Sequence, residues 1–251
     1  MPDVYCGPAP APQTLLLAWN FDPVALALCA AILGIHAASG RRDGQRGDRS
    51  DGRSMALAGT GVLALLFLSP LCALTVSLFS ARVAHHALLI GVVAPLLALA
   101  FRGVRFPAPS LPLSALTGLN ALLLWFWHVP QVYEVAIVGA LPYWTMQLSL
   151  LGAAFALWRA ALAPAAHPGS AIFALLATMV QMGMLGALLT FARSPLYVPH
   201  LGTTQAFGLS PLADQQLAGL IMWVPASLPY LVAALLLLSA QLAPASSRRV
   251  R

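Results

Sequence analysis

The stretch that decides the fold of this chain is PLADQQLAGLIMWVPASLPYLVAALLLLSAQL, residues 211–242. It contains 32 residues and a single charged side chain, Asp214. A helix of that length extends roughly 48 Å at about 1.5 Å per residue. The hydrocarbon core of a bilayer is only about 30 Å thick. The stretch therefore predicts a membrane-spanning helix whose first turn, with Asp214, lies in the headgroup region and avoids full burial.

The start of this helix and its interruption are both marked by proline. Ser210 followed by Pro211 predicts an N-cap and a first helical position. Asp214 then falls where a negative charge meets the positive end of the helix dipole. Pro225 and Pro229 predict a bend, which a membrane helix tolerates when its neighbours satisfy the freed carbonyls.

One face of the same helix combines a polar, a small and a thioether residue, Gln215, Gly219 and Met222. Their spacings of four and seven place them on one stripe. The stripe predicts either the lining of a site near the membrane surface or the packed face of a capped, kinked helix.

The composition extends the membrane prediction to the whole chain. Hydrophobic residues make up 60% and charged residues 8% of the 251 residues, and the mean hydropathy is +0.83. A soluble domain is usually about 25% charged. We therefore predict a single membrane domain over residues 1–251, with the lipid bilayer as its surroundings. The net charge of +6 does not indicate nucleic-acid binding here, because the arginines follow membrane topology.

The cysteines and the N-terminus carry little signal. Cys6, Cys29 and Cys72 are too few and too scattered to predict a disulfide framework or a zinc motif. Cys6 is expected on a mobile tail. Residues 1–13 lack a basic segment and do not resemble a cleaved signal peptide.

Seven stretches are apolar enough to predict transmembrane helices, so the predicted fold is an all-α, polytopic, seven-helix membrane protein. Between the first two stretches lies SGRRDGQRGDRSDGRS, residues 39–54, which predicts a disordered cytoplasmic loop. The predicted spans are roughly 15–38, 55–79, 84–101, 112–128, 142–162, 170–192 and 212–242.

Arginine sets the predicted orientation. All 13 basic residues are arginine, and cytoplasmic loops carry the excess of positive charge. With the N-terminus outside and the C-terminus cytoplasmic, only Arg82 and Arg193 are external. The other 11 are internal: Arg41, Arg42, Arg46, Arg49, Arg53, Arg102, Arg105, Arg159, Arg248, Arg249 and Arg251.

This orientation sorts the polar residues by side. His36 and His167 fall toward the cytoplasm, and His200 is expected in a solvated outer loop. Polar groups in or beside membrane spans are costly, and they are functional candidates by default. Those at or near the outer face are His85, His86, His128, Glu134, Gln147, Asp214, Gln215 and Gln216.

Within this set we define an outer polar cluster: Arg82, His85, Glu134, Asp214 and Gln215. Arg82 is expected to pair with Glu134 or Asp214, or to bind phospholipid headgroups. Such a cluster could also stabilise the outer end of the bundle without any cofactor.

The chain resembles the caa3-type cytochrome c oxidase assembly-factor family, the CtaG-like membrane proteins. SPLADQQLAGLIMWVP (210–225) is similar to the family signature, and LWFWHVPQVYEVAI (124–137) to its Trp-His-x-Pro-x-x-Tyr element. The resemblance continues in the same order in three further stretches. These are WNFDP (19–23), LSPLCALTVSLFSARVAHHALL (68–89) with APLLALA (94–100), and GALLTFARSPLYVPH (186–200).

The resemblance implies seven spans, a bacterial inner-membrane location and a role in maturing haem–copper oxidases, with copper delivery or insertion as the suggested activity. The implied partners are cytochrome c oxidase subunits and other copper-handling assembly factors. Family members often carry a His-x-x-x-His pair at the start of the third span; here Arg82 replaces the first histidine and His86 remains. Trp144 and Gln147 align with another frequent family histidine.

Copper is the one cofactor expected, bound transiently. Cu(I) favours thiolate, thioether and imidazole ligands. The chosen metal ligands are His86, His128, Met182 and Met222, although methionine also commonly fills gaps in packed interiors. Other candidates on the same side are His85, Cys72, Met146, Met179 and Met184.

Three classes of function stay open from the sequence. The first is a non-enzymatic assembly factor acting at the outer face. The second is a metal or small-ion transporter, for which the inner halves of the spans offer little beyond His36. The third is a haem-binding electron carrier, with His86 and His128 as one axial pair. Motifs typical of enzymes, such as a phosphate-binding glycine loop or HExxH, are absent from the sequence.

Overall fold

The computed structural model describes residues 4–40, 48–104 and 111–242, and the regular elements in this part of the chain are all helices. The first elements are η1 (Leu15–Leu17), α1 (Pro23–Gly40), α2 (Asp48–Leu68), α3 (Pro70–Ser77), α4 (Phe79–Leu88), η2 (Leu89–Val93), α5 (Ala94–Ala100) and α6 (Leu113–Trp127). The remaining elements are α7 (Pro130–Ala136), α8 (Ala140–Ala161), α9 (Pro168–Thr190), η3 (Val198–His200), η4 (Thr204–Phe207), α10 (Pro211–Trp223), η5 (Pro225–Ser227) and α11 (Leu228–Leu242). The all-α prediction is confirmed.

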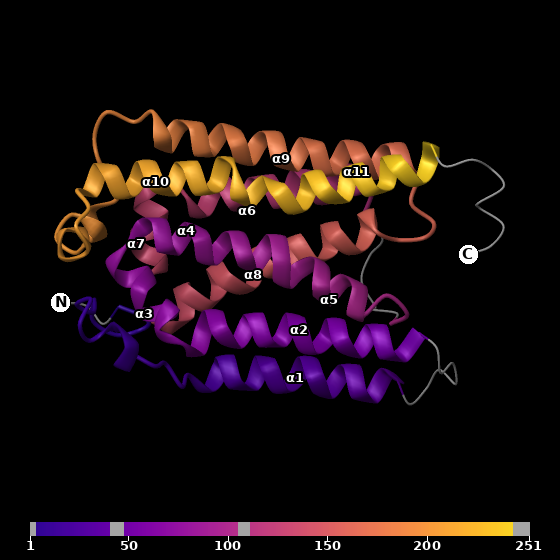
Figure 1. The fold of residues 1–251 in the computed structure, drawn as a ribbon, viewed down its shortest axis with the longest axis horizontal. Coiled ribbons are helices and arrows are strands. Elements are labelled where there is room, and N and C mark those ends of the chain that lie inside the picture. The colour runs from indigo at the N-terminus through magenta and orange to yellow at the C-terminus, as the bar shows by residue number, and fades with distance from the viewer. Residues whose placement is uncertain (1–3, 41–47, 105–110, 243–251) are drawn as a thin grey trace.

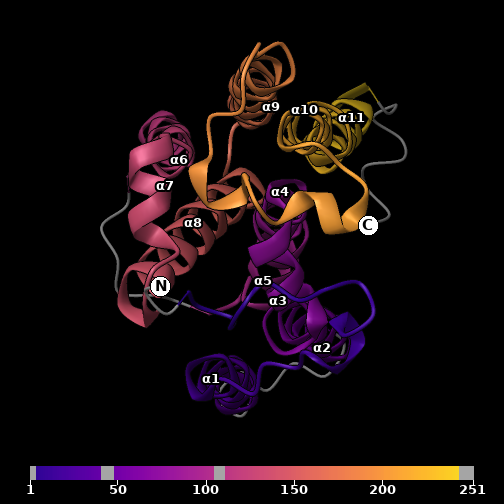
Figure 2. The same ribbon diagram turned by 90° about the vertical axis from the view of Figure 1, so that its left-hand side faces the viewer.

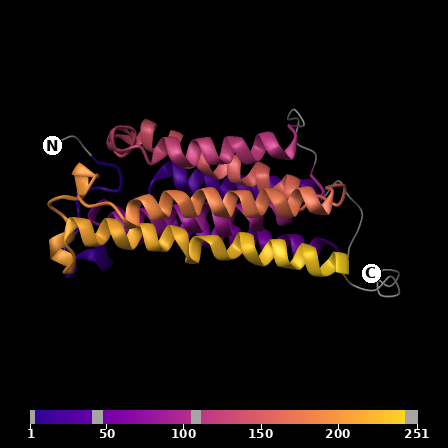
Figure 3. The same ribbon diagram turned by 90° about the horizontal axis from the view of Figure 1, so that it is seen from above.

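The long helices run side by side along one axis, so the molecule is an elongated bundle with two ends (Figure 1). The first described residues lie at one end, and α11 terminates at the other. Seen from above, α6 lies along one side of the bundle and the α10–α11 pair along the opposite side (Figure 3). We call the end that carries α3, α7 and the start of α10 the outer end.

Five helical segments are long and apolar enough to cross a membrane: Asp51–Leu68, Phe79–Ala100, Ala140–Ala161, Pro168–Thr190 and Pro211–Leu242. The apolar helices Pro23–Ser39 and Leu113–Trp127 lie along the same axis of the bundle but are shorter than these five. A multi-pass membrane protein is therefore supported. Seven crossings and the orientation of the termini stay predictions.

Several predicted boundaries are wrong. Residues 15–22 precede α1, which begins at Pro23, where Asp22 Oδ1 caps it by accepting the amides of Val24 (2.7 Å) and Ala25 (2.9 Å). The predicted span 55–79 is broken at Ser69 and again at Leu78. The predicted loop 39–54 is shorter at both ends, because α1 reaches Gly40 and α2 begins at Asp48. Its central part, 41–47, lies outside the described residues.

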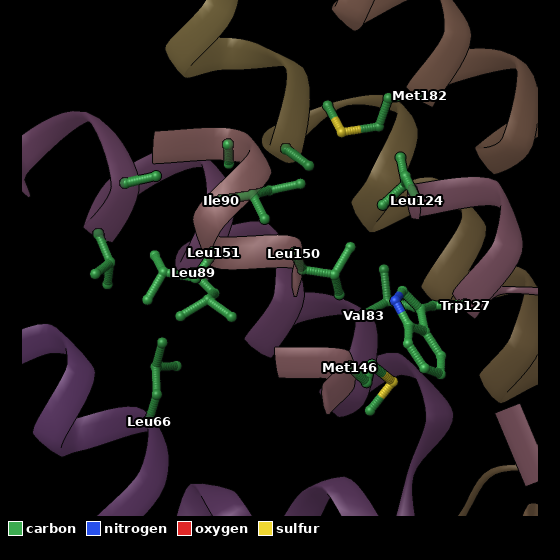
Figure 4. Close-up of a cluster of buried hydrophobic side chains, with 14 of the residues drawn as sticks. Leu66, Val83, Leu89, Ile90, Leu124, Trp127, Met146, Leu150, Leu151 and Met182 are labelled. Atoms are coloured by element: carbon green, nitrogen blue, oxygen red, sulfur yellow. The ribbon is translucent and has the colours of Figure 1, made fainter. Parts of the chain in front are cut away.

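The centre of the bundle is the continuous helix α4–η2–α5, surrounded by the other long helices (Figure 2). Its middle is a π turn, Leu89–Val93. A π turn leaves backbone carbonyls without their usual partners. Here the Ile90 carbonyl accepts Trp158 Nε1 from α8 (2.9 Å) and the Tyr230 hydroxyl from α11 (3.4 Å). Apolar side chains of α2, α6, α8 and α9 pack with those of this central helix in the core (Figure 4).

The helix predicted over 212–242 is interrupted at Pro225, but its two parts do not bend away from each other. α10 ends at Trp223, one 3₁₀ turn follows, and α11 continues along the same line (Figure 1). The Ser227 hydroxyl donates to the Trp223 carbonyl at 2.7 Å, which satisfies an acceptor that the break frees. Pro229 then packs against Gly91 in the π turn, where an added Cβ would lie 3.3 Å from Pro229 Cγ.

Candidate functional site

Asp214 organises the outer end by capping a helix other than its own. Its Oδ2 accepts the Phe79 amide at 2.7 Å, and Oδ1 accepts the Ser80 amide at 3.2 Å and the Ser80 hydroxyl. The N-cap residue of α4, Leu78, supplies no side-chain cap. The carboxylate from α10 therefore satisfies the first amides of the central helix. Asp214 is fully buried in the protein, so the expectation that it avoids full burial is wrong, whereas its position at the depth of the headgroups stays a prediction.

The stripe on the same helix packs against α9 and the loop that follows α9. Gln215 Oε1 accepts the Leu196 amide at 2.7 Å, and its Nε2 donates to the Ser194 carbonyl at 3.4 Å. Gly219 lies so close to α9 that an added Cβ would be 2.5 Å from the Gly186 carbonyl oxygen. These contacts favour the packing interpretation of the stripe for Gln215 and Gly219.

Three histidines meet in the interior of the outer end. The ring centroids of His85 and His86 lie 6.0 Å apart, and those of His86 and His128 lie 5.9 Å apart. All three side chains are at most 5% exposed. The predicted pair, His86 from α4 and His128 after α6, is therefore brought together, although the helices follow each other through a connection at the opposite end.

The hydrogen bonds of this pair define which nitrogens are available. His128 Nδ1 lies 2.7 Å from the Leu124 carbonyl. Because a carbonyl only accepts, Nδ1 carries the proton and Nε2 keeps its lone pair. Neither ring nitrogen of His86 has a hydrogen-bond partner among the described residues. The pair offers two neutral imidazoles in an apolar setting, which suits a soft metal ion.

A loop covers the histidines. Residues 191–210, between α9 and α10, cross the outer end of the bundle (Figure 2). The Tyr197 hydroxyl donates to the His128 carbonyl at 2.8 Å, and the Thr203 hydroxyl donates to the Ser77 carbonyl at 2.7 Å. Phe79 stacks on Tyr197 with ring centroids 3.7 Å apart. The loop thus shields the pair from the surrounding solvent.

His200 belongs to this loop, and its predicted solvation is wrong. It is 3% exposed, and its Nε2 lies 2.8 Å from the Tyr133 hydroxyl. Burial lowers the pKa of His200 to about 3, and the positive charge of Arg82 lowers it in the same direction. His200 is therefore neutral near pH 7.

Arg82 is buried without the ion pair that the sequence suggested. It is 1% exposed, and none of its three side-chain nitrogens has a hydrogen-bond partner in the described part of the chain. Asp214 is engaged with α4 instead, and Glu134 is only half buried. The guanidinium carbon lies 5.3 Å from the Tyr143 ring centroid. Pairing of Arg82 with Glu134 or Asp214 is a prediction that the structure contradicts.

The sulfur candidates separate into buried and exposed groups. Met146, Met182 and Met222 are buried in the core, whereas Met184 is 57% exposed and faces away from it. Met182 is drawn next to Leu124 in Figure 4, on the neighbouring helices α9 and α6. Within the described residues, His, Cys, Asp and Glu do not gather in any group of three that could hold a metal. A copper site here would consist of two imidazoles, with thioether as the remaining type of ligand.

The structure contains a disulfide that the sequence did not predict. Cys6 and Cys72 are bonded, with their Cα atoms 5.6 Å apart. Tyr5 stacks on Tyr143 at 3.8 Å between ring centroids. The expectation of a mobile tail at Cys6 is therefore wrong, and Cys72 does not supply a free thiolate in this state.

The sequence profile of the cytochrome c oxidase caa3 assembly factors matches residues 34–243. The chain belongs to this family of assembly factors. No curated protein and no solved structure matches the chain. The match includes both histidines of the pair, Arg82, Asp214 and the covering loop, while Cys6 lies outside it.

Sequence reasoning missed the aromatic residues that build this end of the molecule. Phe79, Tyr133, Tyr143 and Tyr197 are all buried at the outer end. Tyr133 lies within the quoted stretch 124–137, five residues after His128, and Tyr197 lies three residues before His200. Tyrosines within a few residues of a histidine in two separate stretches were the available signal.

Proposed function

We propose that this assembly factor carries Cu(I) as cargo at its outer end, on the imidazoles of His86 and His128, for insertion into a cytochrome c oxidase. The family places the chain among factors for caa3-type oxidases. The observation that carries the copper step is the buried imidazole pair, with ring centroids 5.9 Å apart. The environment is apolar and shielded, which favours a soft monovalent ion over a hydrated divalent one.

The remaining ligand is proposed to be a thioether of Met182 or Met222, both buried on the helices that flank the pair. Two imidazoles and a thioether form a set suited to Cu(I). Arg82 lies four residues before His86 and repels a cation. We therefore expect weak, transient binding, which suits a factor that passes its metal on.

The proposed orientation places this end outside the cytoplasm, in a bacterial inner membrane. The 11-to-2 distribution of arginine supports it. The Cys6–Cys72 disulfide supports it independently, because disulfides persist in oxidising compartments. The oxidase subunits would then receive copper at the outer surface.

The test is Cu(I) competition with a chromogenic chelator, using purified protein in detergent. The His86→Ala and His128→Ala variants should each lose at least about tenfold in affinity, the effect of losing one interaction of about 1.4 kcal/mol. His167→Ala is the matched control, because His167 is exposed at the opposite end. The same variants should lower oxidase copper content in cells without lowering the amount of the factor in the membrane.

Two results would overturn this proposal. Copper affinity that is unchanged in the double variant would show that the ligands lie elsewhere. A haem absorbance band in the purified protein would instead favour an electron carrier with the same two histidines as axial ligands.

A further inference from the structure

The guanidinium group of Arg82 is the least compensated charge in the described part of the chain. It is 1% exposed, and Nε, Nη1 and Nη2 all lack a hydrogen-bond partner there. Burying an unpaired charge has an effective cost of several kcal/mol. The ring of Tyr143, whose centroid lies 5.3 Å from the guanidinium carbon, offers only a cation–π contact. That contact is too weak to offset the burial.

The described groups around Arg82 do not neutralise its charge. The positive charge of Arg82 adds to burial in lowering the pKa of His200, so His200 is neutral near pH 7. The neutral hydroxyls of Tyr133 and Tyr143 lie beside the guanidinium but do not form a hydrogen bond of good geometry with it. Asp214 also acts on Tyr133, but its carboxylate binds two amides and a hydroxyl of α4. Arg82 is thus a buried cation whose described hydrogen-bonding neighbours are neutral.

Other unpartnered hydrogen-bonding groups lie on the same helices. His85, one turn after Arg82 on α4, has two ring nitrogens without a partner in the described structure. On α8, Gln147 lies one turn after Tyr143, and its amide oxygen and nitrogen are equally unpartnered. Both side chains are at most 2% exposed. A guanidinium, an imidazole and an amide can together direct several N–H donors at one acceptor.

We propose that Arg82 binds a small monovalent anion, a halide ion or a carboxylate group, at the outer end of the bundle, with His85 and Gln147 as additional donors. An anion there supplies the missing opposite charge and accepts the free N–H groups, and charge-assisted hydrogen bonds to guanidinium are among the strongest in proteins. The site is separate from the His86–His128 pair and does not depend on copper binding.

The first experiment measures the thermal unfolding midpoint of the purified protein in sodium chloride, sodium acetate and sodium isethionate at one ionic strength; isethionate is neither a halide nor a carboxylate. Chloride or acetate should raise the midpoint saturably in the wild type, because a ligand of the folded state stabilises by mass action. A response to chloride identifies a free halide as sufficient, and a response to acetate alone identifies a carboxylate group. An identical midpoint in all three salts would overturn the proposal.

Arg82→Gln separates an anion site from an ordinary structural arginine. In isethionate this variant should be at least as stable as the wild type, because it removes an uncompensated buried charge. In chloride or acetate it should lose the stabilisation, with apparent anion affinity lower by at least about tenfold. A variant that is less stable by the same amount in all three salts would show that the protein itself satisfies Arg82.

Three further variants complete the test. Arg193→Gln is the matched control, since Arg193 is exposed, and it should keep the full anion response. Gln147→Leu should weaken the response without abolishing it.

Asp3→Asn tests for a counter-ion within the chain, because Asp3 lies outside the described residues. The anion response of this variant should equal that of the wild type. An Asp3→Asn variant with a much stronger anion response would identify Asp3 as the internal counter-ion and overturn the proposal.

Discussion

At the scale of single residues, Asp214 shows how one side chain can fix two helices. As the first-turn carboxylate of α10 it also caps the start of α4. Asp214→Asn keeps the shape of the side chain but loses its charge and one acceptor oxygen. We expect a loss of about 1–3 kcal/mol in the free energy of unfolding, the cost of leaving buried amides poorly satisfied. Thermal unfolding in detergent measures this loss.

The matched control for Asp214 is Glu134→Gln. Glu134 is half buried, so the substitution should stay within about 0.5 kcal/mol, as for most surface changes. Equal destabilisation by both substitutions would mean that general charge, and not the cap, stabilises the outer end.

The burial of His200 predicts how the stability of the protein depends on pH. Its pKa is about 3 in the folded protein, against an unfolded value near 6.5. Between these values the unfolded chain binds the extra proton, so the contribution of neutral His200 is complete above about pH 6.5 and is lost as the pH falls toward 3. The unfolding midpoint of the wild type should therefore fall more steeply between pH 7 and 4 than that of His200→Gln. Parallel pH profiles would show that His200 is not buried as the neutral form.

At the scale of elements, the contact between α9 and α10 depends on glycine. An added Cβ at Gly219 would lie 2.4 Å from Thr190 Oγ1 and 2.5 Å from the Gly186 carbonyl. Gly219→Ala should therefore push the helices apart and cost about 1–3 kcal/mol, as overpacking does. Gly118→Ala, in α6, is the control, because nothing lies within 4 Å of its added Cβ. This control should be neutral or slightly stabilising, since alanine favours helix.

The covering loop makes a second prediction at this scale. The Tyr197 hydroxyl ties the loop 191–210 to the carbonyl of His128. Tyr197→Phe removes that bond and keeps the stacked ring, so the loop should open more often. If His86 and His128 carry copper, stopped-flow transfer of Cu(I) to a chelator should become faster, with affinity changed less than the rate. Leu201→Ala, an exposed position in the same loop, should leave the rate unchanged.

At the scale of the whole molecule, the orientation is open to a direct test. Reporter fusions after Gly44 and Arg251 should report the cytoplasm, and a fusion near Thr203 should report the outside, since 11 of the 13 arginines are predicted to be internal. A cytoplasmic signal at Thr203 would overturn the proposed orientation.

The disulfide can be tested by thiol labelling. Cys29 is the one free cysteine among those the structure describes. It alone should react with a thiol reagent under denaturing conditions until the Cys6–Cys72 disulfide is reduced.

The sequence by itself determined the properties that depend on the solvent around the chain. With 8% charged residues, every long apolar stretch must satisfy its backbone internally, and helices are the way to do so within one segment. The family was also recognisable from 124–137 and 210–225, because these stretches combine rare polar residues with apolar neighbours at fixed spacing. His86 and His128 were therefore proposed as candidates from the sequence alone, and Pro225 was recognised as a point where the helix is perturbed.

Only the tertiary structure decided which polar groups meet. Arg82 and Asp214 have opposite charges and belong to the same end of the bundle, yet Asp214 is engaged with α4 and Arg82 is left without a partner in the described chain. Cys6 and Cys72 are 66 residues apart in sequence and still form a bond. Helical periodicity fixes which residues share one face, but it does not fix which faces of different helices touch. That choice is made by close packing, as where Gly219 meets Gly186, and it is a property of the assembled bundle.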